Sequence, residues 1–365
     1  MTLKARLARQ EFVAYLERTH REVNSEDLYA YCGRNRFSKE YIRSVYHRYQ
    51  NLTQDVGRIF VAVNLHNSRH ILPNMAMQIL ELADVLGHQN LYISVYENGS
   101  TDQTKDILGA FGHVLQAMGI THSVVTADKP LGGSRHRIEY MAELRNQALA
   151  PFYTNKGEYD KVLFLNDIFF CLPDVLELML QSKIQRSHLT CGEDFVLRHG
   201  ALRFYDTWVA RDILGHAFKG RHQEIAQDGY ALVSQMHGRP FQVQCCWNGM
   251  AVIDSSVFKT PSPIRFRRSG PSECSASECS LFCNDMWSAG FTRAVVVPRV
   301  KVSYAIETRD LLKLPANFPR DAPFRPGKLK EIAYRPGPES VYCHPLNSPG
   351  VHTPDGPASF VAVQQ

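Results

Sequence analysis

Two polar side chains follow an apolar run near the middle of the chain, and their types suggest metal-assisted chemistry. The segment KVLFLNDIFF places Asn166 and Asp167 after four apolar residues and before three more. An ionised carboxylate in an apolar layer is costly unless a charge or hydrogen bonds meet it. A divalent cation is one such partner, because hard cations prefer oxygen ligands. An ion pair with an arginine such as Arg145 is the alternative, and one carboxylate does not decide between them.

Two earlier apolar runs, RIFVAV and LYISVY, are also followed by polar residues. Both carry side chains that can meet the base, hydroxyls or phosphates of a sugar nucleotide: Asn64, Asn67, Arg69, Glu97, Asn98, Ser100 and Asp102. In the second cluster, ENGSTD, a carboxylate can take a ribose diol or a base edge while Gly99 lets the backbone turn. The alternative is a plain turn in which Ser100 or Thr101 caps a helix that begins at Asp102.

Positive charge for such a donor is available on a predicted helix before KVLFLNDIFF. The segment IEYMAELRNQALAPFY carries Arg145, and Arg135 and Arg137 lie shortly before it. Arginine donates charge-assisted hydrogen bonds to phosphate oxygens. A structural ion pair is the alternative for Arg145, and a solvated loop is the alternative for the other two.

A second pair of carboxylates lies in the segment SASECSLFCNDMW. If Ser277 or Ser275 caps a helix there, Glu278 and Asp285 fall at positions i and i+7 and share one face. Either carboxylate can orient an acceptor hydroxyl or take up its proton, which is general base chemistry. An amphipathic helix with its polar face in water explains the same spacing.

Three residues indicate an acceptor side, namely Trp247 and Asn248 in CCWNGMAVID and Asp194 in CGEDF. An apolar sugar face stacks on an aromatic ring while an amide reads its hydroxyls. The alternative for Trp247 is a place in the core. Asp206, in FYDTW, is a further candidate for an acceptor groove or else a turn residue.

These segments need a scaffold that brings them to one edge, and the hydrophobic pattern predicts one. From Arg58 onward, short apolar runs alternate with longer helical segments. Such alternation predicts βαβ units in an α/β fold, with a Rossmann-like, mostly parallel central sheet flanked by helices. Open sheets of this class bind ligands at the carboxyl ends of their strands. The polar clusters that follow the strands are therefore expected to meet.

Three regions are predicted along the chain. Residues 1–56 read as a helical, stem-like region, residues 57–310 as the α/β domain, and residues 311–365 as a proline-rich tail that packs on the domain. Later apolar runs, such as FQVQCC and TRAVVVPRVKVSYA, predict further strands of the same sheet.

Composition excludes several classes of protein. The 365 residues are 44% hydrophobic and 21% charged, as in an ordinary globular protein. The formal charge of +5 is small, and Lys and Arg are interspersed with Asp and Glu, so no nucleic-acid partner is expected. There is no apolar run long enough for a membrane span or a signal peptide, so we expect any membrane anchor to lie outside this sequence.

Nine cysteines favour an oxidising secretory lumen, and their odd number leaves one unpaired if the others form disulfides within the chain. A zinc site is one interpretation of the three nearby cysteines Cys274, Cys279 and Cys283. The other is that they form disulfides with Cys245, Cys246 or other cysteines. Asn51-Leu52-Thr53 is also a glycosylation sequon, which fits a glycoprotein.

The order of the motifs resembles the nucleotide-sugar half of a GT-A glycosyltransferase. There, segments comparable to VAVNLHNSR, ENGSTDQT, AELRNQAL and KVLFLNDIFF hold base, ribose, diphosphate and metal. Downstream, CGEDF, FYDTWVARD, CCWNGMAVID and SECSLFCNDMW resemble the fungal capsule-associated mannosyltransferases of glycosyltransferase family 69. The resemblance covers roughly residues 58–305.

This resemblance implies a GT-A fold and a retaining α-1,3-mannosyltransferase that moves mannose from GDP-mannose to a mannoside or oligosaccharide acceptor. It implies a divalent cation, Mn²⁺ or Mg²⁺, bound by Asp167. It also implies a type II membrane protein of the Golgi lumen that makes capsule or cell-surface glycan, with an anchor before Met1. The usual signature is Asp-x-Asp, whereas this chain has Asn166-Asp167-Ile168. Whether Asn166 or His344 contacts the metal is left open.

Two rival functions differ in what they require. A sugar nucleotidylyltransferase should carry a glycine-rich loop near its first strand, but NLHNSRHILPN has no glycine. A noncatalytic carbohydrate-binding or complex-forming protein that retains the scaffold is favoured only by Asn166, because an amide stands where the signature has an acid.

Overall fold

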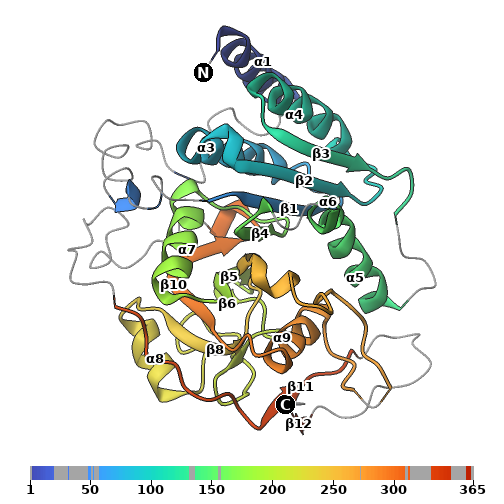
Figure 1. Cartoon of the computed structure of the whole chain (residues 1–365). Helices are drawn as coiled ribbons and strands as arrows, with labels where there is room; N and C mark the ends of the chain where they lie inside the picture. Colours follow the sequence, from blue (N-terminus) through green and yellow to red (C-terminus); the bar gives the residue numbers. More distant parts are fainter. Residues whose placement is uncertain are drawn as a thin grey trace.

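The protein is described here by a computed structural model that covers residues 2–19, 32, 48–50, 52, 57–130, 136–154, 158–271, 273–308, 311–312, 330–346 and 359–362. Strands and helices alternate from residue 59 to residue 198, as predicted, and strands follow one another more often after that (Figure 1). The strands are β1 (Ile59–Leu65), β2 (Leu91–Glu97), β3 (Thr121–Thr126), β4 (Lys161–Leu165), β5 (Leu189–Arg198), β6 (Ala201–Phe204), β7 (Arg211–Asp212), β8 (Phe241–Cys245), β9 (Met250–Asp254), β10 (Ala294–Ser303), β11 (Ser340–Cys343) and β12 (Ser359–Ala362). The helices are α1 (Leu3–Thr19), α3 (Leu72–Leu86), α4 (Thr104–Met118), α5 (Arg137–Ala148), α6 (Ala150–Thr154), α7 (Leu172–Gln185), α8 (Gly229–Met236) and α9 (Glu278–Ser288).

A ten-stranded sheet forms the centre of the described chain, in the order β3-β2-β1-β4-β9-β5-β10-β8-β7, with β6 paired to β5. The pairs β3-β2, β2-β1, β1-β4 and β5-β10 are parallel. Following the pairings across the sheet, β6, β8 and β9 run against the other seven strands. The prediction of an α/β fold with a mostly parallel central sheet is confirmed.

The sheet is covered on both faces, and alternate residues of each central strand enter different cores. In β1, Ile59 and Val61 pack with α3, α4 and α7, whereas Phe60 and Ala62 pack on the side of α5, α6 and α9. All four side chains have no exposed surface. Strands buried on both faces read as continuous apolar runs, which is why the sequence shows no polar alternation there.

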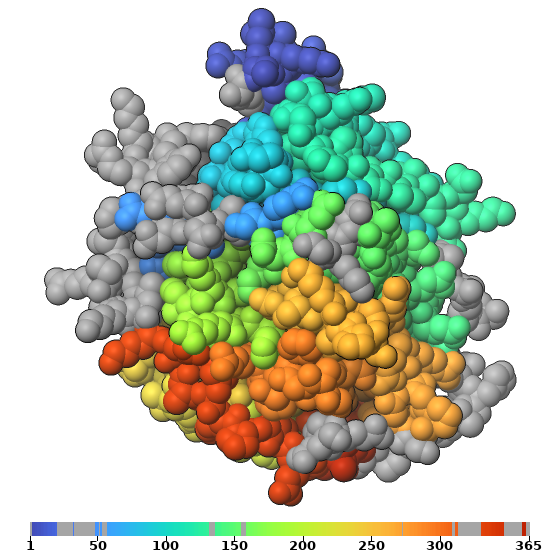
Figure 2. All heavy atoms as spheres, viewed as in Figure 1, coloured from blue at the N-terminus to red at the C-terminus, as the bar shows by residue number. Residues whose placement is uncertain are grey.

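The two ends of the described chain lie far apart on this scaffold (Figure 1). Helix α1 packs on α4 through the rings of Phe12 and Phe111, whose centroids are 6.0 Å apart. Figure 2 shows α1, in dark blue, standing against α4 at one end of the molecule. The hairpin of β11 and β12 lies at the opposite end. The described residues contain no helix long and apolar enough to cross a membrane.

Four disulfides connect elements that are distant in sequence. They are Cys32–Cys171, Cys191–Cys246, Cys245–Cys283 and Cys274–Cys343. Cys279 is the remaining cysteine, and it is buried. The prediction of disulfides is therefore confirmed. The zinc alternative does not fit, because two of its three proposed thiols are bonded elsewhere.

Parallel pairing brings the predicted polar clusters to one edge of the sheet. Leu65 at the end of β1 lies opposite Glu97 at the end of β2. Leu165 at the end of β4 pairs with Met250, the first residue of β9. A bridge between Phe169 and Ser303 then joins the segment after β4 to the end of β10. The carboxyl edge is therefore built from β2, β1, β4 and β10, with β9 and β5 between the last two.

Candidate functional site

The loops after β1 and β2 hold each other through side chains. The Ser100 hydroxyl accepts a hydrogen bond from the backbone N–H of Asn67 at 2.8 Å, and Asn67 Oδ1 accepts one from the N–H of Thr101 at 2.9 Å. The Glu97 carboxylate accepts from the N–H of Ser100. Asn67 has a φ of 51°, a left-handed conformation that asparagine tolerates better than most residues. These residues therefore build one interlocked pair of loops.

Two buried oxygens near the ends of β1 and β2 have no hydrogen-bond partner among the described residues. Glu97 Oε2 is buried and unsatisfied, and so is Asn64 Oδ1, whose own amide nitrogen donates to the Leu144 carbonyl at 2.8 Å. Buried polar atoms are nearly always satisfied in native proteins, so each such atom is a candidate for a ligand contact. Asn98 is also buried, and its carbonyl lies 2.8 Å from His66 Nδ1.

The start of α4 differs from the prediction. The helix begins at Thr104, not at Asp102, and neither Ser100 nor Thr101 caps it. Asp102 does this instead, since Oδ1 accepts from the N–H of Thr104 at 3.0 Å and Oδ2 accepts from the N–H of Arg69 at 3.2 Å. Burial opposes ionisation of Asp102, but these hydrogen bonds outweigh it and lower the pKa of the carboxyl. Ser100 is unavailable as a cap because it binds the β1 loop.

The side chain of Asn166 contacts three neighbouring side chains at the carboxyl edge of the sheet. Its Oδ1 accepts from Arg145 Nη1 and from Trp247 Nε1, both at 3.2 Å. Arginine and tryptophan nitrogens only donate, so the atom that they meet must be the amide oxygen. The amide also contacts the Tyr304 hydroxyl. An oxygen that already accepts two hydrogen bonds is a poor metal ligand. This argues against coordination of a metal by Asn166.

Arg145 is buried in an aromatic cage and forms an ion pair. Its Nε donates to Glu278 Oε1 at 2.8 Å, and both side chains are less than 10% exposed. The guanidinium carbon lies 4.7 Å from the ring centroid of Trp247, 5.3 Å from that of Phe164 and 5.5 Å from that of Phe266. Of the two alternatives for Arg145, phosphate binding and a structural ion pair, the structure shows the ion pair.

Asp167 has no ion-pair partner among the described residues. Burial raises the pKa of its carboxyl, while its own backbone N–H and the positive charges of His70, Arg145 and His66 partly offset this effect. The alternative pairing of Asp167 with Arg145 is not formed, because Arg145 binds Glu278. In the part of the chain that the structure describes, no group of three or more His, Cys, Asp or Glu residues could hold a metal. Asp167 is therefore a carboxylate that could bind a cation without other His, Cys, Asp or Glu ligands grouped around it in the described chain.

The residues predicted for the acceptor side are buried. Trp247 is 1% exposed, so its ring has no face for a sugar, and the structure favours the core alternative. Asn248 is fully buried, and its amide donates to the Gly192 carbonyl at 2.7 Å. Asp194 is fully buried as well; its Oδ2 accepts from the Tyr304 hydroxyl and its Oδ1 from the N–H of Asp206, both at 3.1 Å. Burial, and then the charge of Asp206, raise the pKa of Asp194.

The two carboxylates predicted to be catalytic form ion pairs with two different arginines. Ser277 caps α9, as one of the two predicted options, and accepts from the N–H of Cys279. Glu278 then pairs with Arg145, whereas Asp285 binds Arg267 through two hydrogen bonds of 2.7 and 2.8 Å. Both carboxylates have charge partners that explain their presence. A catalytic role for either one stays a prediction.

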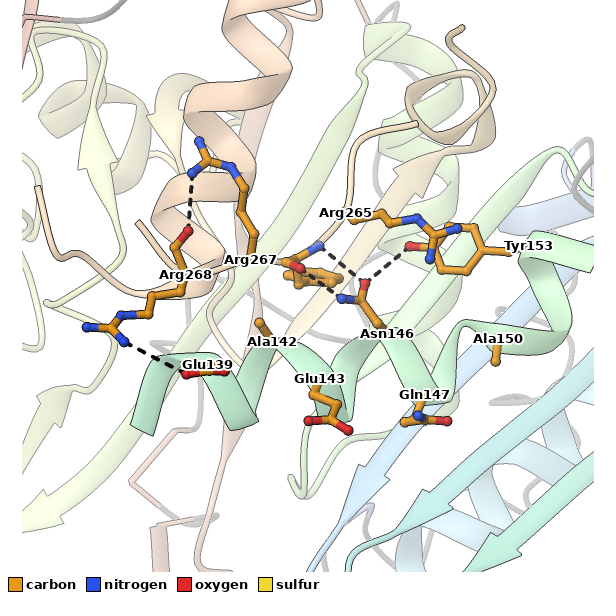
Figure 3. Close-up of a pocket in the computed structure, with 11 residues that line it drawn as sticks. Glu139, Ala142, Glu143, Asn146, Gln147, Ala150, Tyr153, Arg265, Arg267 and Arg268 are labelled. Carbon is orange, nitrogen blue, oxygen red and sulfur yellow. Dashed lines mark hydrogen bonds and ion pairs between the residues drawn. The ribbon is translucent and has the colours of Figure 1, made fainter. Parts of the chain in front are cut away.

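A cavity of about 550 Å³ lies between α5 and residues 265–268 (Figure 3). The Asn146 side chain donates to the Phe266 carbonyl at 2.8 Å and accepts from the Phe266 N–H at 3.3 Å. The guanidinium of Arg265 lies over the Tyr153 ring, 3.9 Å from its centroid. Because Phe266 also packs on Arg145, the floor of this cavity supports the cage of the strand-end site.

Three residues at this edge were not singled out from the sequence. Tyr205 and Tyr304 pack against each other with centroids 4.7 Å apart and tilted rings, and His70 is one of the residues that lower the pKa of Asp167. Tyr205 precedes Asp206 in the quoted segment FYDTW, and an aromatic ring beside a candidate carboxylate was the available signal. Tyr304 gave no signal, since it ends an ordinary strand pattern. Of the other open calls, Arg135 lies outside the described residues, and His344 is exposed beside Tyr342.

Comparison with known proteins adds sequence relatives. A family model described as Cryptococcal mannosyltransferase 1 matches residues 58–285. The α-1,3-mannosyltransferase CMT1 of Cryptococcus neoformans var. neoformans serotype D is 31% identical over 279 residues. That alignment covers 70% of this chain and 59% of the relative, so the chain spans about three fifths of the length of the curated relative that it matches. The resemblance drawn from the motifs is confirmed.

Solved structures with a similar fold are more remote. S. aureus TarS 1–349 in complex with UDP-GlcNAc has 16% identity and a TM-score of 0.40, covering 66% of this chain and 56% of its own. The mannosyltransferase PcManGT from Pyrobaculum calidifontis, in complex with GDP-Man and Mn²⁺, has 12% identity and a TM-score of 0.40, covering 72% of this chain and 64% of its own. These TM-scores are too low to support any conclusion about the site.

Proposed function

The chain belongs to the Cryptococcal mannosyltransferase 1 family, and we propose that it is a metal-assisted mannosyltransferase with a GT-A scaffold. In this proposal it transfers mannose from GDP-mannose to a mannoside acceptor. The observation that carries the proposal is Asp167: a largely buried carboxylate at the end of β4, with no charge partner in the described chain. At the same edge, two strands away at the end of β2, Glu97 has a buried oxygen without a hydrogen-bond partner among the described residues.

A divalent cation fits the residues present. Asp167 offers carboxylate oxygens that no described arginine or lysine neutralises. Mg²⁺ sites in nucleotide enzymes often use one or two carboxylates and complete their shell with phosphates and water, so a single acid is sufficient. Mn²⁺ or Mg²⁺ bound there would act as a Lewis acid on the diphosphate leaving group. Asn166 does not take part as a ligand, because its oxygen accepts from Arg145 and Trp247.

The chain's own residues then have distinct tasks. The interlocked loops after β1 and β2 present Glu97 and Asn64, whose free oxygens can accept hydrogen bonds from the ribose or base of the donor. Arg145 adds positive charge near Asp167, which favours an anionic diphosphate at this edge. Arg145 acts as a positioning residue in this scheme, since its guanidinium is fully engaged by Glu278, Asn166 and three rings.

The finer assignments follow from the relatives and from general chemistry. An α-1,3 linkage is proposed because the relative CMT1 is named an α-1,3-mannosyltransferase. For a retaining transfer, the leaving diphosphate itself can take the acceptor proton, which would leave Glu278 free for its structural ion pair. We also propose that the protein works in the Golgi lumen on capsule or cell-surface glycan. Four disulfides support an oxidising compartment of this kind.

Calorimetric titration of GDP and GDP-mannose, with and without Mn²⁺, tests the donor site. The wild type should bind both nucleotides only with the metal, and Asp167→Ala should lose at least about 90% of that affinity, a loss of about 1.4 kcal/mol or more. Asp106→Ala, which removes an exposed carboxylate from α4, is the matched control and should bind as the wild type does. Metal-dependent binding that survives in Asp167→Ala would contradict the metal assignment.

One alternative function rests on a specific observation. The amide of Asn166 stands where the GT-A signature has an acid, and its oxygen is committed, so the metal would have one protein carboxylate instead of two. A noncatalytic carbohydrate-binding protein on the same scaffold would need no second acid. Release of mannose from GDP-mannose, by transfer to a mannoside or by hydrolysis, separates the two. Nucleotide binding without any turnover would favour the noncatalytic protein.

A further inference from the structure

Tyr205 is an exposed aromatic residue at the edge of the sheet that carries Asp167. It follows β6 directly and is 45% exposed. One side of its ring packs on Tyr304, with centroids 4.7 Å apart and an interplanar angle of 53°. The guanidinium of Arg198 lies near the same ring, 6.0 Å from its centroid. A large apolar ring surface is therefore held at the surface without being buried.

Both Tyr205 and the residue that supports it are tied to the same buried residue, Asp194. The N–H of Tyr205 donates to the backbone carbonyl of Asp194 at 3.0 Å. The Tyr304 hydroxyl donates to Asp194 Oδ2 at 3.1 Å. The next residue, Asp206, donates its N–H to Asp194 Oδ1 at 3.1 Å. A ring held in this way loses little further freedom when it binds a ligand, which favours affinity.

This platform lies next to the Asn166-Asp167 segment. The Asn166 N–H donates to the Gly249 carbonyl at 2.9 Å, and a Cβ on Gly249 would lie 3.3 Å from the Tyr304 hydroxyl. The N–H of Phe169 donates to the Ser303 carbonyl at 2.7 Å, which places Tyr304 beside the same segment. Burial, and then the carboxyls of Asp194, Asp206 and Asp167, raise the pKa of the Tyr205 hydroxyl, so these groups lie near one another.

We propose that Tyr205 is the stacking platform for a pyranose ring of the acceptor glycan, a role that rests on the proposed transferase function. The C–H face of a pyranose packs on an aromatic ring, while carboxylates and hydroxyls nearby read its hydroxyl groups. The donor residues Asn64, Asn67 and Glu97 end β1 and β2 on one side of β4. Tyr205 comes from the β5-β6 side of the same edge, so it lies on the other side of β4 from these donor residues.

Exposure alone does not single out Tyr205, and the chain provides a matched control. Tyr230 on α8 is 49% exposed, and the guanidinium of Arg335 lies 5.5 Å from its ring centroid. It therefore has the same ring, the same exposure and a similar cationic neighbour. In the described chain no tyrosine ring packs against it, and it lies on a helix that packs on β8 instead of at the strand-end site.

Steady-state kinetics with a mannoside acceptor test the proposal. Tyr205→Ala should raise the acceptor KM about tenfold, which corresponds to about 1.4 kcal/mol of lost binding, without weakening GDP-mannose binding. Tyr205→Phe should keep the acceptor KM within about twofold, since stacking needs the ring and not the hydroxyl. Tyr230→Ala should change neither parameter. An active Tyr205→Ala enzyme with a normal acceptor KM would overturn the platform and leave the transferase proposal standing.

A binding measurement separates failure of the platform from failure of the transferase. Tyr205→Trp places a fluorophore at the ring, and titration with a manno-oligosaccharide should change its emission, whereas Tyr230→Trp should not respond. A response without any transfer from GDP-mannose would support the platform on a noncatalytic protein. If the indole at position 205 gives no response and the wild type still transfers mannose, the platform is wrong and the function is right.

Discussion

Asn166 and Asp167 are adjacent in sequence but serve different purposes. The side chain of Asn166 turns towards the buried donors of Arg145 and Trp247, whereas the Asp167 side chain has no charge partner in the described chain. An amide suits the first position because its oxygen can accept from both nitrogens and its nitrogen can still meet Tyr304. A carboxylate there could not donate to the Tyr304 oxygen, whose own proton is already donated to Asp194 Oδ2.

The sequence shows where such residues lie along the chain, but not in which direction their side chains point. Asn166 and Asp167 were found because polar side chains are conspicuous after a buried strand. Trp247 was equally conspicuous, yet the structure buries it against Arg145. Its partners, Phe164, Phe266 and Arg145, come from separate segments, so no local pattern could reveal the cage. Tyr205 was missed for the same reason, since its support is a tyrosine 99 positions later.

The buried carboxyl of Asp194 predicts a dependence of stability on pH. Its pKa is raised well above the ordinary 3.8 in the folded protein, by burial and then by Asp206. A group with a raised folded pKa contributes stability that is present below the unfolded pKa and is lost as pH rises towards the folded pKa. Asp194→Asn removes this loss, and its amide can still accept from the N–H of Asp206.

We therefore expect Asp194→Asn to gain stability relative to the wild type as the pH rises above the ordinary pKa of 3.8, by up to about 1.4 kcal/mol for each pH unit in which only the folded form is protonated. Urea unfolding at several pH values measures the difference. The exposed Asp106→Asn should run parallel to the wild type across the range. A constant difference between Asp194→Asn and the wild type would show that Asp194 is ionised in both states.

At the scale of elements, one buried ion pair joins two helices across the site. Arg145 on α5 meets Glu278 at the first turn of α9, and the side chains are 7% and 5% exposed. Removing one partner from a buried pair leaves an uncompensated charge, which costs far more than the pair contributes when intact. The helices were predicted from their apolar spacing, but this contact links positions 133 residues apart and had no local signal.

Glu278→Gln is expected to lower the free energy of unfolding by about 3–5 kcal/mol, because it leaves the guanidinium of Arg145 buried without a charge partner. The control is Asp285→Asn, which breaks the partly exposed pair with Arg267 and should cost about 0–1 kcal/mol. Urea unfolding gives both values. Replacing both partners, by Arg145→Met with Glu278→Leu, should cost less than Glu278→Gln alone. Equal costs for Glu278→Gln and Asp285→Asn would contradict a buried pair.

Predicting elements worked best where burial imposed a pattern. The parallel strands β1, β2 and β4 lie between two helical layers and read as unbroken apolar runs. The start of α4 was misplaced by two residues, because Asp102 caps from outside the helix while Ser100 holds a neighbouring loop. The insertion of antiparallel β9 between β4 and β5 could not be read either, since strand order depends on pairings across the whole chain.

At the scale of the whole molecule, the disulfides fasten the later half of the chain to the sheet. Cys191–Cys246 joins β5 to the residue after β8, and Cys245–Cys283 joins β8 to α9. Cys274–Cys343 ties the segment before α9 to the last residue of β11. The presence of disulfides followed from the number of cysteines, but their connectivity did not, because many pairings of nine cysteines are compatible with one sequence.

The last of these disulfides should hold the β11-β12 hairpin against the domain. Besides the bridge, the described contacts of β11 with the rest of the chain include two hydrogen bonds. The Tyr342 N–H donates to the Gly215 carbonyl at 2.8 Å, and Arg211 Nε donates to the Tyr342 carbonyl at 2.6 Å.

Closing a loop between cysteines 69 positions apart is worth about 4 kcal/mol in the chain-entropy account. Replacing Cys274 and Cys343 together by serine should therefore expose the hairpin to limited proteolysis while metal-dependent GDP binding persists. Replacing Cys245 and Cys283, which clamp α9 beside Glu278, should instead weaken both stability and GDP binding. Equal protease resistance of the Cys274/Cys343 variant and the wild type would mean that backbone contacts alone retain the hairpin.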